Sequence, residues 1–447
     1  MARAKKETAL TPEVRLQAAL VPDWEQPYKL PENWCWTTVG AINQYVGISA
    51  DPTKAKNKTF ELYSVPSSAD NYPEIVLGAD IGSTKQSVKK GDVLLCKINP
   101  RINRVWKVSK YTDHSLLASS EWIVIRNSGL ISNYLMWCFR SPYFRGYMLS
   151  NVSGVGGSLM RAQPKFVQGY PVPVPPLAEQ QRIVDRIESL FAKLDEAKEK
   201  AQAVVDSFET RKAAILHKAF TGELTAKWRE EHGVSIDNWK TTRFDSVAAI
   251  RSNLVDPAEY QSFPHIAPDN IEKKTGVLLE YHTIAEDGVT SGKHRFYSGQ
   301  ILYSKIRPYL SKAVVVDFDG LCSADMYPIE AYQNARCLWY YMLSDEFLLQ
   351  ASTAGSRSVL PKINQKELSA LTVHLPTNDR EQEEIARILD ELFDKEQQTK
   401  EAAEIVLDQI ELMKKSILAR AFRGELGMND PNEESAVELL KRGLEKK

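Results

Sequence analysis

Cysteine is scarce and scattered in this chain of 447 residues. The five cysteines form no CxxC pair, and their odd number argues for free thiols in a reducing compartment, against a disulfide framework or a structural zinc. No apolar export segment follows the basic start MARAKKETAL, and the longest weakly charged stretch, residues 128–139, is too short to span a bilayer. We therefore expect a cytoplasmic protein without a membrane anchor.

Motifs that would indicate catalysis are missing as well. The sequence has no GxxxxGK[ST] phosphate loop, no HExxH, no GxSxG and no Asn-Pro-Pro-aromatic signature of DNA amino-methylation. The histidines are dispersed, and none has metal-ligand spacing with cysteines or carboxylates. Asp269 and Glu272 lie too close in sequence to come from adjacent strands of a nuclease site. The cluster SGVGGS at 153–158 lacks GxGxxG order but could lie against phosphates as a loop. These absences favour a binding protein.

Neither sign of charge dominates, because the formal net charge is -1. Any nucleic-acid binding must therefore come from local clusters of cations. Residues 83–110 hold eight Lys or Arg against one acid, Asp92, and residues 291–312 hold five Lys or Arg and no acid. An ordinary solvated basic surface is the alternative for either stretch taken alone.

What the chain does contain is a duplicated element. Residues 179–224 recur without a gap as residues 381–426, with roughly two in five positions identical, which chance similarity between helices does not produce. Glu179-Gln180 returns as Glu381-Gln382, and the closing AFTGEL returns as AFRGEL.

Apolar residues in each copy follow the 4-3-4-3 rhythm of a heptad seam. The pattern predicts one long helix per copy, about 58 Å for residues 179–217 at about 1.5 Å per residue. We expect the two helices to pair as an antiparallel coiled coil, loosened midway by Glu396 and Thr399. The alternative is that each helix merely packs on its neighbouring domain. The predicted seam residues are Ile183, Ile187, Leu190, Leu194, Val204 and Phe208 in the first copy, and Ile385, Leu389, Leu392, Val406 and Ile410 in the second.

The segments before each helix are duplicated too. GDVLLCKINP at 91–100 aligns with GQILYSKIRP at 299–308, and both read as a Gly turn, an alternating strand and Lys-Ile-x-Pro. Asn33-Trp34 recurs as Asn238-Trp239. GSLMRAQPKF at 157–166 and GSRSVLPKI at 355–363 share a Gly-Ser turn, an Arg and a Pro-Lys pair. Each half therefore runs from a strand-rich domain through a Pro-containing connector into a heptad helix.

These repeats predict an α+β protein with an internal pseudo-two-fold repeat: two strand-rich α/β domains joined by two long helices in an antiparallel coiled coil. The predicted parts are an N-terminal extension (1–31), the first domain (32–176), the first heptad helix (177–220), a linker (221–238), the second domain (239–376), the second heptad helix (377–422) and a C-terminal tail with a short amphipathic helix (423–447).

The double pattern PPLAEQQRIV...LF...LD followed by AFTGEL, with its partner EQEEIARILDELFD followed by AFRGEL, resembles the specificity subunit of type I restriction-modification systems. The resemblance covers nearly the whole chain, including the lead-in EQPYKLPENWCW at 25–36. It implies two target-recognition domains that each read one half of an asymmetric, bipartite sequence of double-stranded DNA. It also implies two methylation subunits and a restriction subunit as partners. S-adenosylmethionine, ATP and Mg are expected on those partners, so this chain is expected to bind no cofactor and to have no catalysis of its own.

Cations at strand ends and in loops are the candidates for DNA contact. Lys and Arg can neutralise phosphates, and Arg can also pair bidentately with guanine. For each candidate the alternative is a solvated cation that touches nothing, and Trp106, Trp122 and Tyr309 are predicted to pack in the domains, not to stack on bases. A single-chain restriction-methylation enzyme and a coiled-coil scaffold that does not bind DNA stay open as other functions. The predicted DNA-binding residues are Lys97, Arg101, Arg104, Arg161, Lys305, Arg307, Lys312 and Arg357.

Overall fold

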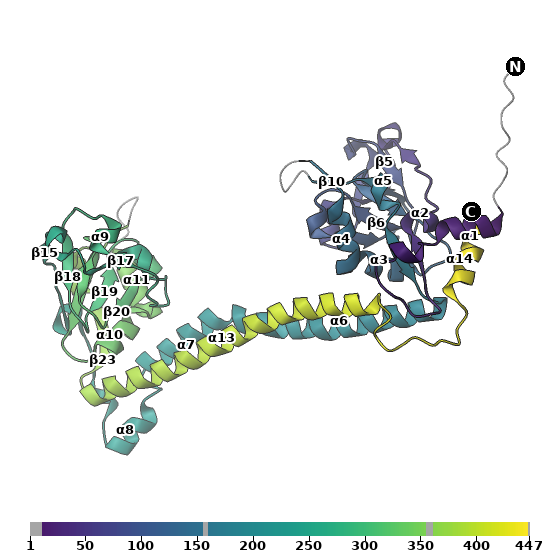
Figure 1. The fold of residues 1–447 in the computed structure, drawn as a ribbon. Helices are drawn as coiled ribbons and strands as arrows, with labels where there is room; N and C mark the ends of the chain where they lie inside the picture. The colour runs from purple at the N-terminus through teal and green to yellow at the C-terminus, as the bar shows by residue number, and fades with distance from the viewer. Residues whose placement is uncertain (1–10, 155–159, 355–360, 446–447) are drawn as a thin grey trace. The chain divides into compact units, whose positions relative to one another are not determined.

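The computed structural model describes residues 11–154, 160–354 and 361–445 (Figure 1). The chain divides into two compact units. Unit 1 holds Met1–Lys200 and Val406–Lys447, and unit 2 holds Ala201–Ile405. Each unit therefore combines one strand-rich domain with a part of both long helices.

The domain of unit 1 is built on two sheets. A five-stranded sheet has the order β2-β5-β8-β3-β4, with β3 parallel to β8, and a three-stranded sheet has the order β7-β6-β9. β1 pairs with β12, and β10 with β11. The strands are β1 (Cys35–Thr38), β2 (Ser49–Ala50), β3 (Thr59–Tyr63), β4 (Glu74–Leu77), β5 (Lys85–Ser87), β6 (Val93–Cys96), β7 (Val105–Lys107), β8 (Ser115–Ala118), β9 (Trp122–Ile125), β10 (Val152–Ser153), β11 (Arg161–Ala162) and β12 (Pro171–Val174).

The domain of unit 2 repeats this topology. Its five-stranded sheet has the order β15-β18-β21-β16-β17, with β16 parallel to β21, and its four-stranded sheet has the order β14-β22-β19-β20. β13 pairs with β23 as β1 does with β12. The strands are β13 (Trp239–Arg243), β14 (Ala248–Ile250), β15 (Leu254–Val255), β16 (Pro264–Ile266), β17 (His282–Thr283), β18 (Lys293–Phe296), β19 (Ile301–Ser304), β20 (Ala313–Val315), β21 (Gly320–Cys322), β22 (Met326–Ala331) and β23 (Thr372–Pro376).

The long helices are α6 (Leu177–Asp206) and α13 (Asp379–Ala421), which contribute to both units. Unit 1 also contains α1 (Pro12–Ala19), α2 (Val39–Ile42), α3 (Ser132–Arg140), α4 (Pro142–Ser150), α5 (Pro164–Val167) and α14 (Ala436–Glu445). Unit 2 also contains α7 (Phe208–Phe220), α8 (Ala226–His232), α9 (Ile284–Asp287), α10 (Ala335–Met342), α11 (Asp345–Ala354) and α12 (Gln365–Ala370). Across the described ranges, no helix is both long and apolar enough to cross a membrane.

Within unit 1, the first part of α6 and the last part of α13 run antiparallel. Lys198 pairs with Glu411 at 2.8 Å, and Lys414 pairs with Asp195, so residue numbers rise on one helix as they fall on the other. The Lys414 ammonium also lies 5.3 Å from the centre of the Phe191 ring, a cation–π geometry. The coiled-coil pairing is thus fixed by polar contacts as well as by apolar ones.

Unit 2 repeats these contacts, with α13 supplying the phenylalanine and α7, which follows α6, supplying the lysine. The Lys212 ammonium lies 5.4 Å from the Phe393 ring centre, as Lys414 does from Phe191 in unit 1. Arg211 Nε donates to Glu396 at 2.7 Å. Glu396, which was expected to loosen the seam, therefore contributes an ion pair in unit 2. The predicted fold class is confirmed, with antiparallel helix pairing inside each unit.

Two details of the helix prediction are corrected. The first helix does not run unbroken to residue 217, because α6 ends at Asp206 and α7 begins at Phe208, while α13 continues through the equivalent position. Val406 was placed in the seam, but it is 40% exposed, and Leu407 is the partly buried residue there. The spacing from Ala403 to Leu407 to Ile410 keeps the 4-3 rhythm with a different residue.

The ends of the long helices belong to the cores of the domains. In unit 1, Ile183 and Ile187 near the start of α6 and Leu418 near the end of α13 are buried with the α3 and β12 side chains. In unit 2, Ile385 and Leu389 of α13 are buried together with α7 and α10. Full burial of one such side chain stabilises a fold by about 1.5–3 kcal/mol. Of the other seam residues, Phe208 and Ile410 are buried, and Leu190, Leu194, Val204 and Leu392 are partly buried.

Candidate nucleic-acid interface

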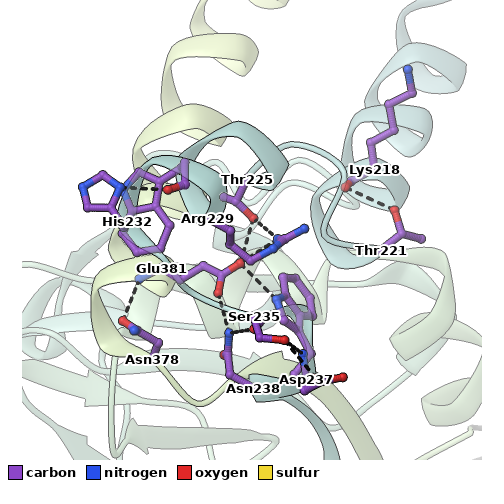
Figure 2. Close-up of polar contacts among 12 residues, drawn as sticks. Lys218, Thr221, Thr225, Arg229, His232, Ser235, Asp237, Asn238, Asn378 and Glu381 are labelled. Atoms are coloured by element: carbon purple, nitrogen blue, oxygen red, sulfur yellow. Dashed lines mark hydrogen bonds and ion pairs between the residues drawn. The ribbon is translucent and has the colours of Figure 1, made fainter.

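A buried carboxylate in the first turn of α13 ties together three segments of unit 2 (Figure 2). Glu381 is fully buried. It joins the start of α13 to the start of α8 and to the beginning of β13, so it fixes the first strand of the domain to the helix. Its oxygens accept hydrogen bonds from Thr225 Oγ1 at 2.9 Å, Arg229 Nη1 at 2.8 Å, Asn238 Nδ2 at 3.0 Å and Trp239 Nε1 at 3.0 Å.

Glu179 takes the same place in unit 1 with different partners. It is 1% exposed and accepts hydrogen bonds from Trp34 Nε1 at 2.8 Å and from Asn429 Nδ2 at 2.9 Å. Trp34 precedes β1, and Asn429 follows α13, so the connected segments match those of unit 2. Both of these hydrogen-bond donors are neutral, whereas Arg229 brings a cation to Glu381.

The glutamine that follows each glutamate adds two more hydrogen bonds between the domain and the helix. Gln180 Oε1 accepts from the Ile131 backbone N–H at 2.9 Å, and its Nε2 donates to the Pro175 carbonyl at 3.0 Å. Gln382 repeats both contacts, with the backbone N–H of the residue before α10 at 3.2 Å and the Pro376 carbonyl at 2.7 Å. Through these hydrogen bonds, the repeated Glu-Gln pair connects the start of each long helix to the strand-rich domain before it.

The two glutamates respond to acid in opposite directions. Burial raises the pKa of Glu179 despite its two hydrogen bonds. Burial also acts on Glu381, but hydrogen bonds led by Arg229 outweigh it and lower the pKa of Glu381. A carboxyl with a lowered folded-state pKa stabilises the fold above its unfolded pKa of about 4.3, and that contribution is lost as the pH falls through the folded value. A carboxyl with a raised folded-state pKa instead stabilises the fold below its unfolded pKa, and that contribution is lost as the pH rises through the folded value.

We therefore expect unit 2 to lose the stability contributed by Glu381 as the pH falls below about 4.3, the unfolded pKa, whereas Glu179 contributes no such loss in unit 1. Urea denaturation followed by hydrogen exchange in each unit measures the effect. In Glu381→Gln the acid-dependent loss in unit 2 should shrink, because the titrating group is gone. An unchanged pH profile in that variant would contradict the assignment.

The Lys-Ile-x-Pro loops have the same unusual backbone in both units. Asn99 and Arg307 take left-handed conformations, with φ 47° and ψ 63° and with φ 48° and ψ 60°. Asparagine tolerates this region, but for arginine it costs about 1–2 kcal/mol, and a following proline normally favours extended backbone. Strain of this kind collects at functional sites. The loops are therefore the strongest candidates for ligand contact in each domain.

An ion pair stands beside each loop. In unit 1, Arg161 lies 3.3 Å from Glu121. In unit 2, Lys362 lies 3.1 Å from Asp325. Single β-bridges join Ile98 to Arg161 and Ile306 to Lys362, so Arg161 and Lys362 are structural equivalents. The sequence match between the two Pro-Lys pairs is thus out of register, because Pro361-Lys362 corresponds to Met160-Arg161.

Comparisons with known proteins match this repeated arrangement. The family model described as "Type I restriction modification DNA specificity domain" matches the chain twice, at residues 47–205 and 236–406, which is more than half of its length. The chain belongs to the type I specificity subunits. It is 36% identical over 345 residues to the Escherichia coli type I restriction enzyme EcoDI specificity subunit, covering 72% of this chain and 76% of that relative. It is 22% identical to the EcoKI specificity subunit of E. coli strain K12, covering 89% and 90%.

Solved structures share the fold of this specificity subunit. The HsdS subunit from Thermoanaerobacter tengcongensis superposes with a TM-score of 0.62 at 20% identity, covering 90% of this chain and all of that one. A chain from a study of "complex assembly" and "conformational transition of the type I R-M system" gives a TM-score of 0.70 at 20% identity with the same coverage.

The predicted DNA-contacting residues of this specificity subunit differ in exposure. Arg101, Arg161 and Arg307 are exposed, and Lys97 and Arg104 are partly exposed. Arg357 lies outside the described residues, as does most of the SGVGGS loop. Arg101 and Arg307 therefore present exposed side chains from the strained loops, whereas Arg161 is paired with Glu121. Their contact with DNA stays a prediction.

Lys305 and Lys312 are engaged inside unit 2. Lys305 Nζ donates to the Ala324 carbonyl at 2.5 Å and is 23% exposed in its side chain. Lys312 Nζ donates to the Pro268 carbonyl at 2.7 Å and is 15% exposed. We expect both lysines to hold loops in place and to contribute mainly to the local potential.

Sequence analysis does not single out several residues that the structure places beside the loops or between domain and helix. The Pro-Lys match in the sequence aligns Lys362 with Lys165, whereas in the structure Lys362 takes the position of Arg161. The sequence does contain a signal for Glu179 and Glu381, the buried acceptors that connect each domain to its helix. Each is a glutamate in the first turn of a repeated helix, next to apolar residues. Trp106 and Trp122 are buried as predicted, but Tyr309 is 48% exposed beside Arg307, contrary to its predicted packing role. Among the described residues no three His, Cys, Asp or Glu side chains gather as metal ligands.

Proposed function

We propose that this specificity subunit reads a bipartite, asymmetric DNA sequence, with one recognition domain for each half. The repeated strained loop is the observation that supports the proposal most. Its backbone is the same in both units, but the side chains differ: KINPRINR in unit 1 and KIRPYLSK in unit 2. Equal loops with unlike side chains suit half-sites of equal geometry and unlike bases.

The chain is further proposed to be the non-catalytic member of its complex. Two methylation subunits and a restriction subunit would bring S-adenosylmethionine, ATP and Mg, and the paired helices would hold these partners. Support comes from membership of the specificity subunits and from the missing catalytic motifs. The chain would act in the cytoplasm, where its DNA substrate is found.

Two assays test this function. The complex reconstituted with its methylation subunits should shift DNA carrying its target, with affinity that falls as salt rises, and the isolated chain should bind no S-adenosylmethionine. Binding of that cofactor by the chain alone would favour a single-chain restriction-methylation enzyme. A complex that assembles but retains no DNA at low salt would favour a scaffold without DNA recognition.

The helix seam should matter for assembly before it matters for base preference. Leu190 and Leu392 are partly buried in the seam, so a lysine at either site would place a charge among apolar side chains. We expect Leu190→Lys and Leu392→Lys to reduce copurification with the methylation subunit by about tenfold, a cost of about 1.4 kcal/mol. Ser189→Lys, at the exposed neighbouring position, is the control. Full copurification of both leucine variants would count against the helices as the scaffold.

A further inference from the structure

In unit 2, a buried lysine of α7 donates to the backbone of a turn that precedes β17. Lys212 is only 8% exposed. Its Nζ donates to the Lys274 carbonyl at 2.8 Å and to the Thr275 carbonyl at 3.4 Å. Both acceptors lie in the turn between Ile271 and Leu278, which pair through a single β-bridge. The ammonium of Lys212 therefore fixes this turn to α7.

The same turn is bonded on its other side to the strained loop of unit 2. The backbone N–H of Lys274 donates to the Leu310 and Ser311 carbonyls at 3.1 and 3.2 Å. Ser311 closes that loop in a left-handed conformation, as Arg307 opens it. Lys274 is itself left-handed, with φ 64°, in a region that residues other than glycine rarely adopt. One residue thus connects α7 to the loop, through its carbonyl on one side and its N–H on the other.

The equivalent lysine of unit 1 has a different acceptor. Lys414 takes the place of Lys212 in the repeat and forms an ion pair with Asp195 of α6. Both ammonium groups lie beside a phenylalanine ring of the facing helix, at 5.3 and 5.4 Å from its centre. The repeat position of Asp195 is Gln397 in unit 2. Backbone carbonyls of the turn therefore take the place of that carboxylate in unit 2.

The strained loop of unit 1 is held by the helices of its own domain. Asn103 Nδ2 donates to the Arg140 carbonyl at the end of α3, at 3.1 Å. Arg145 of α4 donates to the Arg101 carbonyl. These bonds stay within the recognition domain. The two loops thus share a backbone shape but rest on different supports.

We propose that Lys212 is a positioning residue for the half of the DNA target that unit 2 reads. It holds the Lys274 turn to α7, and the turn holds the loop that carries the exposed Arg307. A binding side chain is selective only when the residues around it fix its geometry. Lys212 is buried, so it acts through the loop and not on the DNA itself. This role rests on the proposed function, which assigns a half-site to that loop.

The link between α7 and the loop is tested by hydrogen exchange of the full chain carrying Lys212→Met. Methionine keeps an unbranched apolar side chain beside Phe393 but cannot donate to the turn. We expect the backbone N–H groups of Lys274 and Ser311 to exchange about tenfold faster or more, while β19 keeps its protection. Lys414→Met, the matched variant in unit 1, should leave both positions unchanged. Unchanged exchange at both positions in Lys212→Met would overturn the proposal.

Gln397→Asp tests the same link without removing a buried contact. Gln397 is exposed, so an aspartate there should leave the fold intact and give Lys212 the carboxylate that Lys414 has in unit 1. A shared ammonium should hold the turn less firmly, and we expect the Ser311 N–H to exchange about threefold faster or more. This variant decides the question if Lys212→Met does not fold. Exchange equal to that of the unaltered chain would contradict the link.

The role in target reading is tested in the complex reconstituted with its methylation subunits. Lys212→Met should weaken target binding by about tenfold and reduce discrimination against DNA altered in one half only, whereas Lys414→Met should reduce it in neither. In a chain that already carries Arg307→Ala, Lys212→Met should weaken binding less, since both changes act through one loop. Lost discrimination in both halves, or in neither, would reject the role. An unaltered complex that retains no DNA would reject the proposed function, whereas the exchange result for the full chain would stand.

Discussion

Replacing Glu381 with alanine should lower the free energy of unfolding of unit 2 by about 3–5 kcal/mol. The carboxylate is fully buried and is the partner of Arg229, whose side chain is only 11% exposed. Its removal leaves a largely buried cation without its counter-ion and leaves the Thr225 hydroxyl and the Trp239 indole N–H without their acceptor, while Asn238 keeps the Ser235 carbonyl. Hydrogen exchange in rising urea, read separately for β13 and for the sheet of unit 1, measures the loss.

Glu179→Ala is the matched variant in unit 1. Its two donors are neutral, so the expected loss is about 1–3 kcal/mol, the usual cost of unsatisfied buried polar groups. The difference between the two variants isolates the contribution of the charge. Equal losses in both units would show that the charge of Arg229 adds nothing to its contact with Glu381. A negligible loss in Glu381→Ala would show that this carboxylate does not hold the domain to the start of α13.

Arg307→Ala should weaken target binding by the assembled complex by about 1–3 kcal/mol, or roughly tenfold to a hundredfold. Arg307 is exposed and occupies the strained position of the loop in unit 2. If its contact is to a phosphate, the slope of log affinity against log salt should fall by about one; if it is to a base, specificity should relax in one half-site. Gel shifts over a salt series, on the target and on targets altered in one half, separate the two roles.

Two further variants separate the loss of the Arg307 guanidinium from a change in the loop backbone and from the loss of an arbitrary exposed arginine. Arg307→Asn places the residue of unit 1 in the loop and should keep its left-handed backbone, since asparagine tolerates it, while losing the guanidinium. Arg387→Ala removes an exposed arginine of α13 that is paired with Glu384 and Glu391, and it should leave affinity nearly unchanged. Unaltered binding and slope in both Arg307 variants would take this residue out of the interface.

Much of the fold could be read from the repeat, because two copies of one pattern constrain each other. The heptad spacing identified Leu190 and Leu392, and the Gly-strand-Pro pattern identified β6 and β19. The prediction went wrong where local sequence carries little physical constraint. Val406 and Leu407 are equally apolar, so only packing decides which one enters the seam.

The candidate site was less accessible to sequence reasoning. Cationic residues were found, but the sequence could not tell that Lys305 and Lys312 are bound to carbonyls while Arg307 is exposed. That distinction depends on loops brought together by the sheets. The left-handed conformation of Arg307 could not be predicted from the sequence, because arginine has no preference for that region. The register of Lys362 became clear only from its β-bridge to Ile306.

The most direct test of the central claim is methylation-sensitive sequencing of DNA from cells that carry this chain with its partner subunits. Two unlike recognition loops on equivalent units predict a methylated motif of two different short halves, separated by unspecified bases of constant number. A single uninterrupted motif, a perfect palindrome or a gap of varying length would contradict the account.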